Sequence, residues 1–475
     1  MTRSVLQSRR AVVILAAGQG KRMKSNRPKV LHEVLGEPML AHVLRAADSL
    51  GPMRIVVVTG HGREAVEAWL AGWTSRAPVI SVEQVAPKGT GHAVGFAMSH
   101  IADADEVVVL YGDSPLQTPA TLTRLCEMRG QRPLSLLVTR VADPSGYGRV
   151  LVGEGDTALK IVEDKDANEA EREVDLINAG MMAVDRAFLA SGLKRLRPDN
   201  AQGELYLTDL VGLAADDGSP GNAYEAPPAE THGINTLAEC ARATELLRQR
   251  INGDWMAAGV TIVEPASAWI EATVTLAAGA RIGSACELRG RTTVAAGARI
   301  DRGAVVVDCE IGENAWLKPY TVASDARIGA EAAVGPFAHL RPGTVLDARV
   351  KVGNFVETKK AHLHEGAKAS HLSYIGDADI GAGSNIGAGT ITCNYDGVNK
   401  HRTVLGRGVF IGSDTQLVAP VTVGEGAYVA AGTTVTGDVP AGALAVSRAP
   451  QRNIDGWVAR KQAKQAAALV AKGRS

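Results

Sequence analysis

The first half of the chain alternates short apolar runs with amphipathic segments. Aliphatic runs occur at Ala11–Leu15, Ile55–Thr59 and Val107–Leu110, and between them Pro38–Ser49 and Arg63–Leu70 show helical patterns of apolar positions. Strands separated by helices predict an α/β domain with a Rossmann-like parallel or mixed sheet. Ligands bind beyond the carboxyl ends of the strands in such sheets, so we expect a site in the loops that follow these runs.

Beyond about residue 260 the apolar period becomes six. This period matches neither a helix nor a single strand, and it is typical of the hexapeptide repeats of a left-handed parallel β-helix. The branched residue of each hexad points inward, and three hexads make a coil of about 18 residues. The predicted inward positions are Ile270, Leu276, Ile282, Leu288, Val294, Ile300 and Val306, then Ile328, Val334, Leu340, Leu346 and Val352, then Ile411, Leu417, Val423, Val429 and Val435.

The repeat loses register twice. Val306 and Ile328 are 22 residues apart and Ile386 and Ile411 are 25 apart, and neither gap is a multiple of six. We expect extra residues to bulge or loop out at both places. The second gap contains the polar segment CNYDGVNKHRT, and interrupted solenoids commonly place function at the interruption.

One long helix is predicted between the two patterns. Thr236 and Glu239 form a capping-box signature, and apolar residues follow them at helical spacing. The last residues are rich in Ala, Lys and Gln, which predicts a helical or disordered tail. The expected domains are therefore an α/β domain over 1–235, a linker helix over 236–260, a β-helix over 261–456 and the tail over 457–475.

Charge and cysteine content narrow the classes of partner and compartment. The 51 Lys and Arg residues balance 51 Asp and Glu residues, so no global charge favours nucleic acid or an anionic membrane. The five cysteines are scattered without a CxxC, which disfavours both a disulfide framework and a zinc site and fits a reducing compartment. The chain shows no signal peptide and no apolar window of roughly 18 residues. We expect a soluble, cytoplasmic protein without nucleic-acid or membrane partners.

The loop after the first apolar run is suited to an anion. LAAGQGKRMKSNRPKVL (15–31) combines glycines with five cationic side chains and no acidic one. It lacks the GK[ST] ending of a Walker loop, and Met23 stands where a dinucleotide fingerprint needs a third glycine. Its backbone amides can still approach a phosphate chain, with charge from Lys21, Arg22 and Lys29. A phosphate-binding loop is favoured over a solvated basic loop.

Stacked cations predict a second anion site in the β-helix. Arg341 and Lys359 each follow an inward position and are 18 residues apart, so one coil should stack them about 4.8 Å apart. Lys360 adds charge nearby, and such cations repel each other unless an anion bridges them. His362 and His364 form an HxH that could bind a metal, but no carboxylate or cysteine cluster joins them at ligand spacing, so we disfavour that interpretation.

Motifs in both halves resemble known families. LAAGxGxRM…PKVL at 15–31, GTGHA at 89–93 and YGDSP at 111–115 resemble the sugar-1-phosphate nucleotidyltransferases. With the hexapeptide half, the chain is similar, from about residue 10 to 457, to the bifunctional N-acetylglucosamine-1-phosphate uridylyltransferases/glucosamine-1-phosphate N-acetyltransferases of bacterial cell-envelope synthesis. The resemblance implies a homotrimer, formed through the β-helix, that uses Mg²⁺.

The resemblance also implies two reactions and their substrates. Acetyl-CoA would acetylate glucosamine-1-phosphate, and UTP would then give its UMP to the N-acetylglucosamine-1-phosphate, which yields UDP-N-acetylglucosamine and pyrophosphate. Two alternatives stay open: a monofunctional nucleotidyltransferase with a β-helix that only forms oligomers or binds a regulator, and a non-catalytic sugar-nucleotide sensor. The stacked cations argue against the first alternative.

For uridylyl transfer, the resemblance assigns Mg²⁺ to Asp113 and Asn235, a pair that argues against a sensor. An Asp and a neutral Asn suffice, since Mg²⁺ completes its shell with water and phosphate. From the residues alone, Asp113 could be an ordinary turn residue and Asn235 only a helix cap. The implied nucleotide and sugar contacts are Leu15, Ala16, Ala17, Gly18, Arg22, Lys29, Gln84, Gly89, Thr90, Tyr111, Gly112, Asp113, Gly148, Glu163, Asn178 and Asn235.

For acetyl transfer, the resemblance implies His371 as the base that deprotonates the attacking amine. A lone histidine is more often structural, so this role depends on the resemblance. Glucosamine phosphate would be held by Arg341, Lys359, Tyr374 and Asn385, and acetyl-CoA by Asn394, Tyr395, Ser413, Ala431 and Arg448. One coil of 18 residues should also stack Ser413 on Ala431.

Overall fold

The computed structural model describes residues 9–472 of the chain. They form two compact units that divide between Asp254 and Trp255, with Ile270–Ala272 grouped with the first unit. No helix in the described part of the chain is long and apolar enough to cross a membrane. The five cysteines are free thiols.

The first unit contains a nine-stranded mixed sheet with the strand order β5-β4-β1-β6-β10-β7-β11-β9-β8. Strands β1, β4, β5 and β6 are parallel, and β10 is antiparallel to β6. The three predicted apolar runs are the cores of β1, β4 and β6. The strands are β1 (Arg10–Ala16), β4 (Arg54–Thr59), β5 (Val79–Glu83), β6 (Glu106–Tyr111), β7 (Leu134–Arg140), β8 (Arg149–Val152), β9 (Thr157–Val162), β10 (Leu176–Asp185) and β11 (Gly221–Glu225), with a separate hairpin of β2 (Glu33–Val34) and β3 (Glu37–Pro38).

Helices cover both faces of this sheet because its central strands are apolar on both sides. Ala11 and Val13 of β1 belong to one buried cluster, and Val12 and Ile14 belong to the other. The first cluster includes α3 and α7, and the second includes α1 and α4. The helices of this unit are α1 (Met39–Ser49), α2 (Arg63–Leu70), α3 (Thr90–Ala97), α4 (Pro119–Arg129), α5 (Glu169–Arg172), α6 (Arg186–Gly192), α7 (Asp209–Asp216) and α8 (Pro228–Thr231).

The long helix α9 spans Leu237–Ala257, so the boundary between the units falls within it. Its predicted capping box is present. Thr236 Oγ1 accepts a hydrogen bond from the Glu239 amide at 3.2 Å, and Glu239 Oε2 accepts one from the Thr236 amide at 3.3 Å. At the end of the chain, α10 covers Trp457–Lys472, and its side chains are exposed as far as Leu469.

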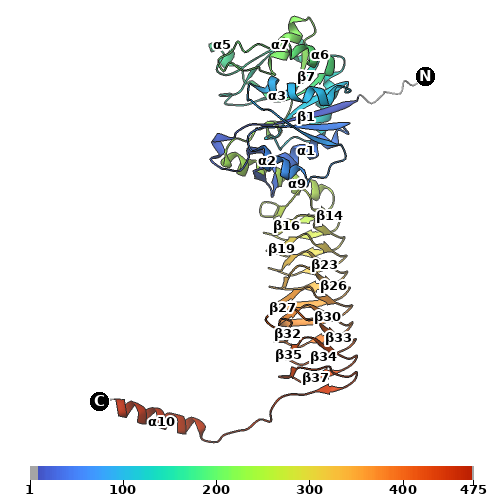
Figure 1. The fold of residues 1–475 in the computed structure, drawn as a ribbon, viewed down its shortest axis with the longest axis vertical. Helices are drawn as coiled ribbons and strands as arrows, with labels where there is room; N and C mark the ends of the chain where they lie inside the picture. Colours follow the sequence, from blue (N-terminus) through green and yellow to red (C-terminus); the bar gives the residue numbers. More distant parts are fainter. Residues whose placement is uncertain (1–8, 473–475) are drawn as a thin grey trace, which may run out of the picture. The chain divides into compact units, whose positions relative to one another are not determined.

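The second unit is a left-handed parallel β-helix, drawn in Figure 1 as a column of stacked short strands. All the predicted inward residues are at most 5 % exposed, because each hexad turns one branched side chain into the column. One side of the column is the nine-stranded sheet of β14 (Thr275–Leu276), β17 (Thr293–Val294), β20 (Glu310–Ile311), β23 (Ala326–Ile328), β26 (Thr344–Leu346), β28 (His362–Leu363), β30 (Ala378–Ile380), β33 (Thr403–Leu405) and β36 (Val421–Val423).

A 19-stranded sheet forms the other two sides. Strands β27 and β29 are long enough to turn the corner between these sides. The strands are β12 (Thr261–Ile262), β13 (Trp269–Ile270), β15 (Arg281–Ile282), β16 (Glu287–Arg289), β18 (Arg299–Ile300), β19 (Val305–Val307), β21 (Trp316–Leu317), β22 (Val322–Ser324), β24 (Ala333–Val334), β25 (His339–Leu340), β27 (Lys351–Lys359), β29 (Lys368–Gly376), β31 (Asn385–Ile386), β32 (Ile391–Cys393), β34 (Phe410–Ile411), β35 (Gln416–Val418), β37 (Tyr428–Val429), β38 (Thr434–Val435) and β39 (Leu444–Ala445).

The two losses of register have different causes. The prediction of extra residues is wrong for the first: two corners there are one residue shorter than a hexad, and Asp308 and Asp325 turn them with φ of 52° and 45°. Aspartate tolerates this left-handed conformation better than most residues, so it can replace a longer turn. The prediction is confirmed for the second, where the chain leaves the column after Cys393 and rejoins it at Thr403.

Candidate active sites

A cavity of about 790 Å³ lies at the carboxyl ends of the parallel strands of the α/β unit. Its lining includes half of the predicted nucleotide residues, namely Leu15, Ala17, Gly18, Gln84, Gly89, Thr90, Tyr111 and Asp113. The lining residues that the sequence did not predict include Gly60, His61, Glu83 and Glu204. The signal for Gly60 and His61 was available, since both follow β4 at the same sheet edge.

Three further predicted residues do not line this cavity: Gly112 and Ala16 belong to the backbone beside it, and Arg22 lies outside it. The Gly112 amide donates a hydrogen bond to the Leu15 carbonyl at 2.9 Å and so joins the loop after β6 to β1. Ala16 is buried at the end of β1. Arg22 lies on an exposed part of the basic loop and is absent from the cavity lining, whereas Lys21 lines the cavity.

Lys29 occupies the centre of the predicted metal pair. Its ammonium donates a hydrogen bond to Asn235 Oδ1 at 2.7 Å and pairs with Asp113 Oδ2. A Cβ at Gly20, whose φ is 61°, would approach the Lys29 Cβ to 2.7 Å, so this glycine lets the loop pack against Lys29. Because Thr236 caps α9, the Asn235 side chain is free of the capping role. Two oxygens from separate segments therefore converge on one cation, as a hard metal ion would require.

The predicted sugar residues Gly148, Glu163 and Asn178 lie close to one another. The Asn178 amide donates to the Gly148 carbonyl at 2.8 Å, and a Cβ on Gly148 would lie 3.2 Å from Glu163 Oε2. Burial raises the pKa of Glu163, even though Thr208 donates a hydrogen bond to it at 3.2 Å. Burial, together with the nearby carboxylates, also raises the pKa of Tyr111. Glu163 and Tyr111 are each partly buried, and polar groups in such places favour specific contacts with sugar hydroxyls.

Two of the predicted nucleotide contacts, Gly89 and Gln84, lie next to each other in the cavity lining. Gly89 has φ of 102°, and its missing side chain lets the Leu205 backbone approach at the start of α3. Gln84 Nε2 donates to the Gly89 carbonyl at 3.2 Å, which fixes its amide beside Thr90. Backbone and amide groups held in this way can read the edge of a base.

In the β-helix, the predicted residues belong to two stacks of strands. The first, here called the Arg341 stack, comprises β25, the ends of β27 and β29, and β32. The second, here called the Asn385 stack, comprises the starts of β27 and β29, then β31, β34 and β37. The two stacks form different sides of the column.

The Arg341 stack carries the predicted phosphate contacts. Leu340 pairs in register with Thr358, so Arg341 lies directly above Lys359 as predicted. Lys400 of the polar excursion, and less strongly Arg341, lower the pKa of Lys359 by repulsion between positive charges. Arg341 is also paired with Glu357 at 2.7 Å, so the repulsion between Lys359 and Lys400 is the main feature that favours an anion here. Tyr374 lies over Gly376, which is level with Lys359 in the next coil.

His371 lies at the corner of β29 between the two stacks, with its side chain exposed. Its Nδ1 is 3.0 Å from Oδ1 of Asn354, which is level with it in the previous coil. A hydrogen bond from Nδ1–H to this oxygen leaves Nε2 with a free lone pair. The imidazole is therefore oriented to accept a proton from solvent or substrate.

The predicted acetyl-CoA residues are split between the stacks. Ser413 and Ala431 are stacked as predicted, and Arg448 donates to the Ala431 carbonyl at 2.6 Å. These residues continue the side that holds Asn385. Asn394 and Tyr395 instead follow β32 on the Arg341 stack, where Asn394 donates to Asp377 Oδ2 at 2.5 Å. One chain does not bring all the predicted acetyl-transfer residues together.

Comparison with known proteins covers both units. Residues 12–174 match the family of MobA-like NTP transferase domains, and residues 402–437 match the bacterial transferase hexapeptide (six repeats). A relative named "Bifunctional protein GlmU" from Sorangium cellulosum is 49% identical over 458 residues, which are 95% of this chain and 96% of the relative. Relatives of the same name from Pelobacter propionicus and Bordetella parapertussis are each 47% identical, over 96% and 94% of this chain and 99% and 98% of their own lengths. The chain belongs to the GlmU family.

This membership makes the chain a bifunctional enzyme with uridylyltransferase and acetyltransferase activity. It acetylates glucosamine-1-phosphate with acetyl-CoA and transfers UMP from UTP to N-acetylglucosamine-1-phosphate. Acetyl transfer belongs to the hexapeptide unit, and uridylyl transfer belongs to the NTP-transferase unit. A GlmU-type nucleotidyltransferase also uses a divalent metal ion.

Proposed function

We propose that uridylyl transfer takes place in the cavity of the α/β unit, with Leu15 to Gly18 and Gln84 holding the nucleotide. The observation that carries this proposal is the convergence of Asp113 and Asn235 on one cationic centre at Lys29. A phosphate oxygen of the sugar attacks the α-phosphorus of UTP, and pyrophosphate leaves. Lys29 and Arg22 offset the charge of the phosphates, while Gly148, Glu163 and Asn178 orient the sugar.

Mg²⁺ is the metal proposed for this site, with Asp113 and Asn235 as its protein ligands. Both are hard oxygen donors, and Mg²⁺ commonly takes one or two protein oxygens, with water and phosphate as its remaining ligands. When bound, the ion neutralises charge on the triphosphate. Lys29 keeps the two oxygens within reach of one point, so its part is to orient them.

We propose that acetyl transfer uses His371 as general base. Nε2 takes a proton from the glucosamine amine as the amine attacks the thioester carbonyl of acetyl-CoA, and the thiolate of CoA leaves. Asn354 fixes the tautomer that keeps Nε2 unprotonated. Arg341, Lys359, Tyr374 and Asn385 would hold glucosamine phosphate, and Asn394, Tyr395, Ser413, Ala431 and Arg448 would hold acetyl-CoA.

The division of these residues between two stacks supports the proposed homotrimer. If the Arg341 stack of one copy faces the Asn385 stack of the next, each interface gathers the full set of residues, and a closed ring of three copies forms three such sites. Exposed aromatic residues mark the corner between the stacks. Tyr320, Phe337 and Phe355 stack there with ring centroids 5.2 and 5.7 Å apart, and each is about half exposed. Such a row of apolar side chains favours burial against another copy.

The assignment is tested by assaying wild type, His371→Ala and Asp113→Ala for both reactions. CoA release is measured with acetyl-CoA and glucosamine-1-phosphate, and pyrophosphate release with UTP and N-acetylglucosamine-1-phosphate. We expect His371→Ala to lose only CoA release and Asp113→Ala to lose only pyrophosphate release. Wild-type CoA release by His371→Ala would overturn the role of this histidine.

A further inference from the structure

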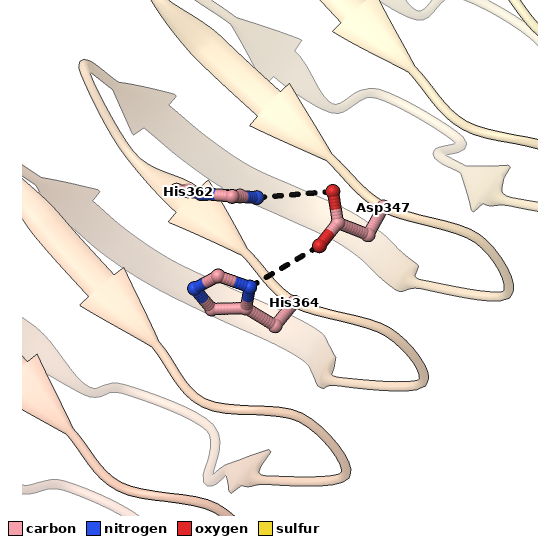
Figure 2. A group of neighbouring side chains, drawn as sticks. All are labelled: Asp347, His362 and His364. Atoms are coloured by element: carbon pink, nitrogen blue, oxygen red, sulfur yellow. Dashed lines mark hydrogen bonds and ion pairs between the residues drawn. The ribbon is translucent and has the colours of Figure 1, made fainter.

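Three polar side chains on the nine-stranded side of the β-helix form a group outside the residues assigned to either reaction. Asp347 follows β26, and His362 and His364 flank the buried Leu363 of β28 in the next coil. His362 Nε2 lies 3.0 Å from Asp347 Oδ1, and His364 Nδ1 lies 3.2 Å from Asp347 Oδ2. Figure 2 shows both imidazoles directed at the one carboxylate.

A fourth residue makes the hydrogen bonding of His364 difficult to satisfy. His364 Nε2 lies 2.9 Å from Asp379 Oδ1, so this ring faces a different carboxylate through each nitrogen. A neutral imidazole has one N–H and one lone pair. One of the two contacts would therefore set a lone pair against a carboxylate, unless a second proton or a metal ion lies between them.

The arrangement around Asp379 favours a metal ion near Asp347. Arg402 Nη2 pairs with Asp379 Oδ2 at 2.7 Å, which compensates the charge of that carboxylate. Asp379 can then accept the Nε2–H of His364, and the Nδ1 lone pair turns toward Asp347. This is the carboxylate–histidine–metal arrangement that orients histidine ligands in metal sites.

The spacing of the three ligand atoms suits a small cation. Tetrahedral Zn²⁺, with bonds of about 2.0–2.2 Å to nitrogen and oxygen, separates its ligands by about 3.3 Å. The histidine–aspartate distances of 3.0 and 3.2 Å, which end on different oxygens of Asp347, are close to that value. With one oxygen taken from Asp347, all three ligand atoms lie within 4.8 Å of one another. Asp347 and His362 also line a hollow of about 520 Å³, which leaves room for water as a further ligand.

We propose that Asp347, His362 and His364 bind a divalent transition-metal cation of the Zn²⁺ class. His362 supplies Nε2, His364 supplies Nδ1 and Asp347 supplies one carboxylate oxygen, while Asp379 orients His364. The ion joins two successive coils of the β-helix, so it stabilises the solenoid and does not take part in group transfer.

The test uses the full-length protein, stripped of metal by chelator and kept in excess Mg²⁺ to fill oxygen-only sites. Zn²⁺ is titrated in competition with a chromophoric chelator, and Co²⁺ spectra report tetrahedral coordination. The variants are the double substitution His362→Ala/His364→Ala, the orienting substitution Asp379→Asn, and His339→Ala as a matched control. His339 is an exposed, outward-facing histidine of the same β-helix.

We expect one tight Zn²⁺ site per chain in wild type and in His339→Ala, and its loss in the double variant. Asp379→Asn should weaken binding by about 10–100-fold, because it removes the partner that orients His364. Zn²⁺ should raise the thermal unfolding midpoint of the β-helix in wild type and leave that of the double variant unchanged. Equal Zn²⁺ affinity in wild type and the double variant would overturn the proposal. The absence of a tight site in wild type would overturn it as well, and would leave a shared proton to bridge His364 and the carboxylates.

Discussion

In the α/β unit, three segments far apart in the sequence bring Lys29, Asp113 and Asn235 into direct contact. In the β-helix, by contrast, Arg341 and Asn385 lie on different sides of the column. The first arrangement provides a nearly complete site within one chain. In our proposal the second provides two half-sites, which a neighbouring copy of the chain completes.

The difference follows from the two folds. A parallel sheet gathers the loops of several strands at one edge, so residues from many segments converge on one cavity. A solenoid displaces each outward residue along one axis, and its neighbours are the residues one coil away. A solenoid therefore forms ladders of similar contacts, such as Arg341 on Lys359, and needs a second body to complete a two-sided site.

The largest expected effect tests whether the first site is complete within one chain. Lys29→Met removes the cation that holds Asp113 and Asn235, and the Lys29 side chain is only 10 % exposed. We expect pyrophosphate release to fall by about 10²–10³-fold, the cost of removing one preorganised charge. CoA release by the same preparation should be unchanged, because the β-helix is untouched.

Lys24→Met is the matched control for Lys29→Met, since Lys24 is an exposed cation of the same loop. It should leave both activities near wild type. A uniform loss of both activities in Lys29→Met would indicate a folding defect, and full retention of pyrophosphate release would exclude an orienting role for Lys29.

The sequence predicts repeating features well and contacts between distant segments poorly. The inward hexads are predictable because each has only one way to be buried. The first loss of register was misinterpreted because a gap of 22 residues is equally consistent with insertion and deletion. Asp308 and Asp325 form the shortened corners, but in the sequence they look like ordinary polar residues. Only their positive φ angles identify the two corners as deletions.

Two side-chain clusters show why the rest was not predictable. Asp347 lies 17 residues before His364, and only a coil shortened by one residue at Lys360, whose φ is 46°, stacks them. An 18-residue coil does not place that carboxylate over the histidine. The second cluster joins Lys29 to Asn235, which lie 206 residues apart, and no local sequence pattern encodes a contact over that separation.

A second prediction tests whether Glu163 contributes to binding of N-acetylglucosamine-1-phosphate. Glu163→Gln keeps the shape of the side chain but removes its charge, so we expect the KM for N-acetylglucosamine-1-phosphate to rise about tenfold or more. kcat for acetyl transfer should not change. Steady-state kinetics of both reactions measure the effect, and an unchanged KM would remove Glu163 from the sugar site.

Comparing the free energy of unfolding of Glu163→Gln with that of wild type should also show that the buried Glu163 carboxylate destabilises the fold. Burial raises the pKa of Glu163, so its charged form is less stable in the fold than in the unfolded chain. This destabilisation is present above the raised pKa and disappears as the pH falls below the ordinary value for glutamate. Glu163→Gln should therefore be more stable than wild type at neutral pH, and urea unfolding should show the difference shrinking toward acidic pH.

A third prediction concerns Asn354 as a positioning residue for His371. Asn354→Ala frees the imidazole, so we expect kcat of acetyl transfer to fall about tenfold with little change in KM. Asn354→Asp keeps the acceptor oxygen but adds a negative charge, which favours the protonated imidazole. The acid limb of its pH–rate profile should therefore move to higher pH. A merely structural asparagine would change neither the profile nor the ratio of kcat to KM.

The smallest expected effect is a difference of about fourfold in CoA release, and it tests most directly whether two chains form the acetyl-transfer site. Arg341→Ala and Asn385→Ala should each abolish acetyl transfer alone, because each removes one half-site from every copy. After the two variants are unfolded and refolded together in equal amounts, random assembly should pair an intact Arg341 stack with an intact Asn385 stack in about a quarter of interfaces. CoA release should then recover to about a quarter of wild type, while pyrophosphate release stays at the wild-type level throughout. If each chain held a complete acetyl-transfer site, mixing the two inactive variants would restore no CoA release. CoA release at about a quarter of the wild-type level would therefore indicate a site formed by two chains.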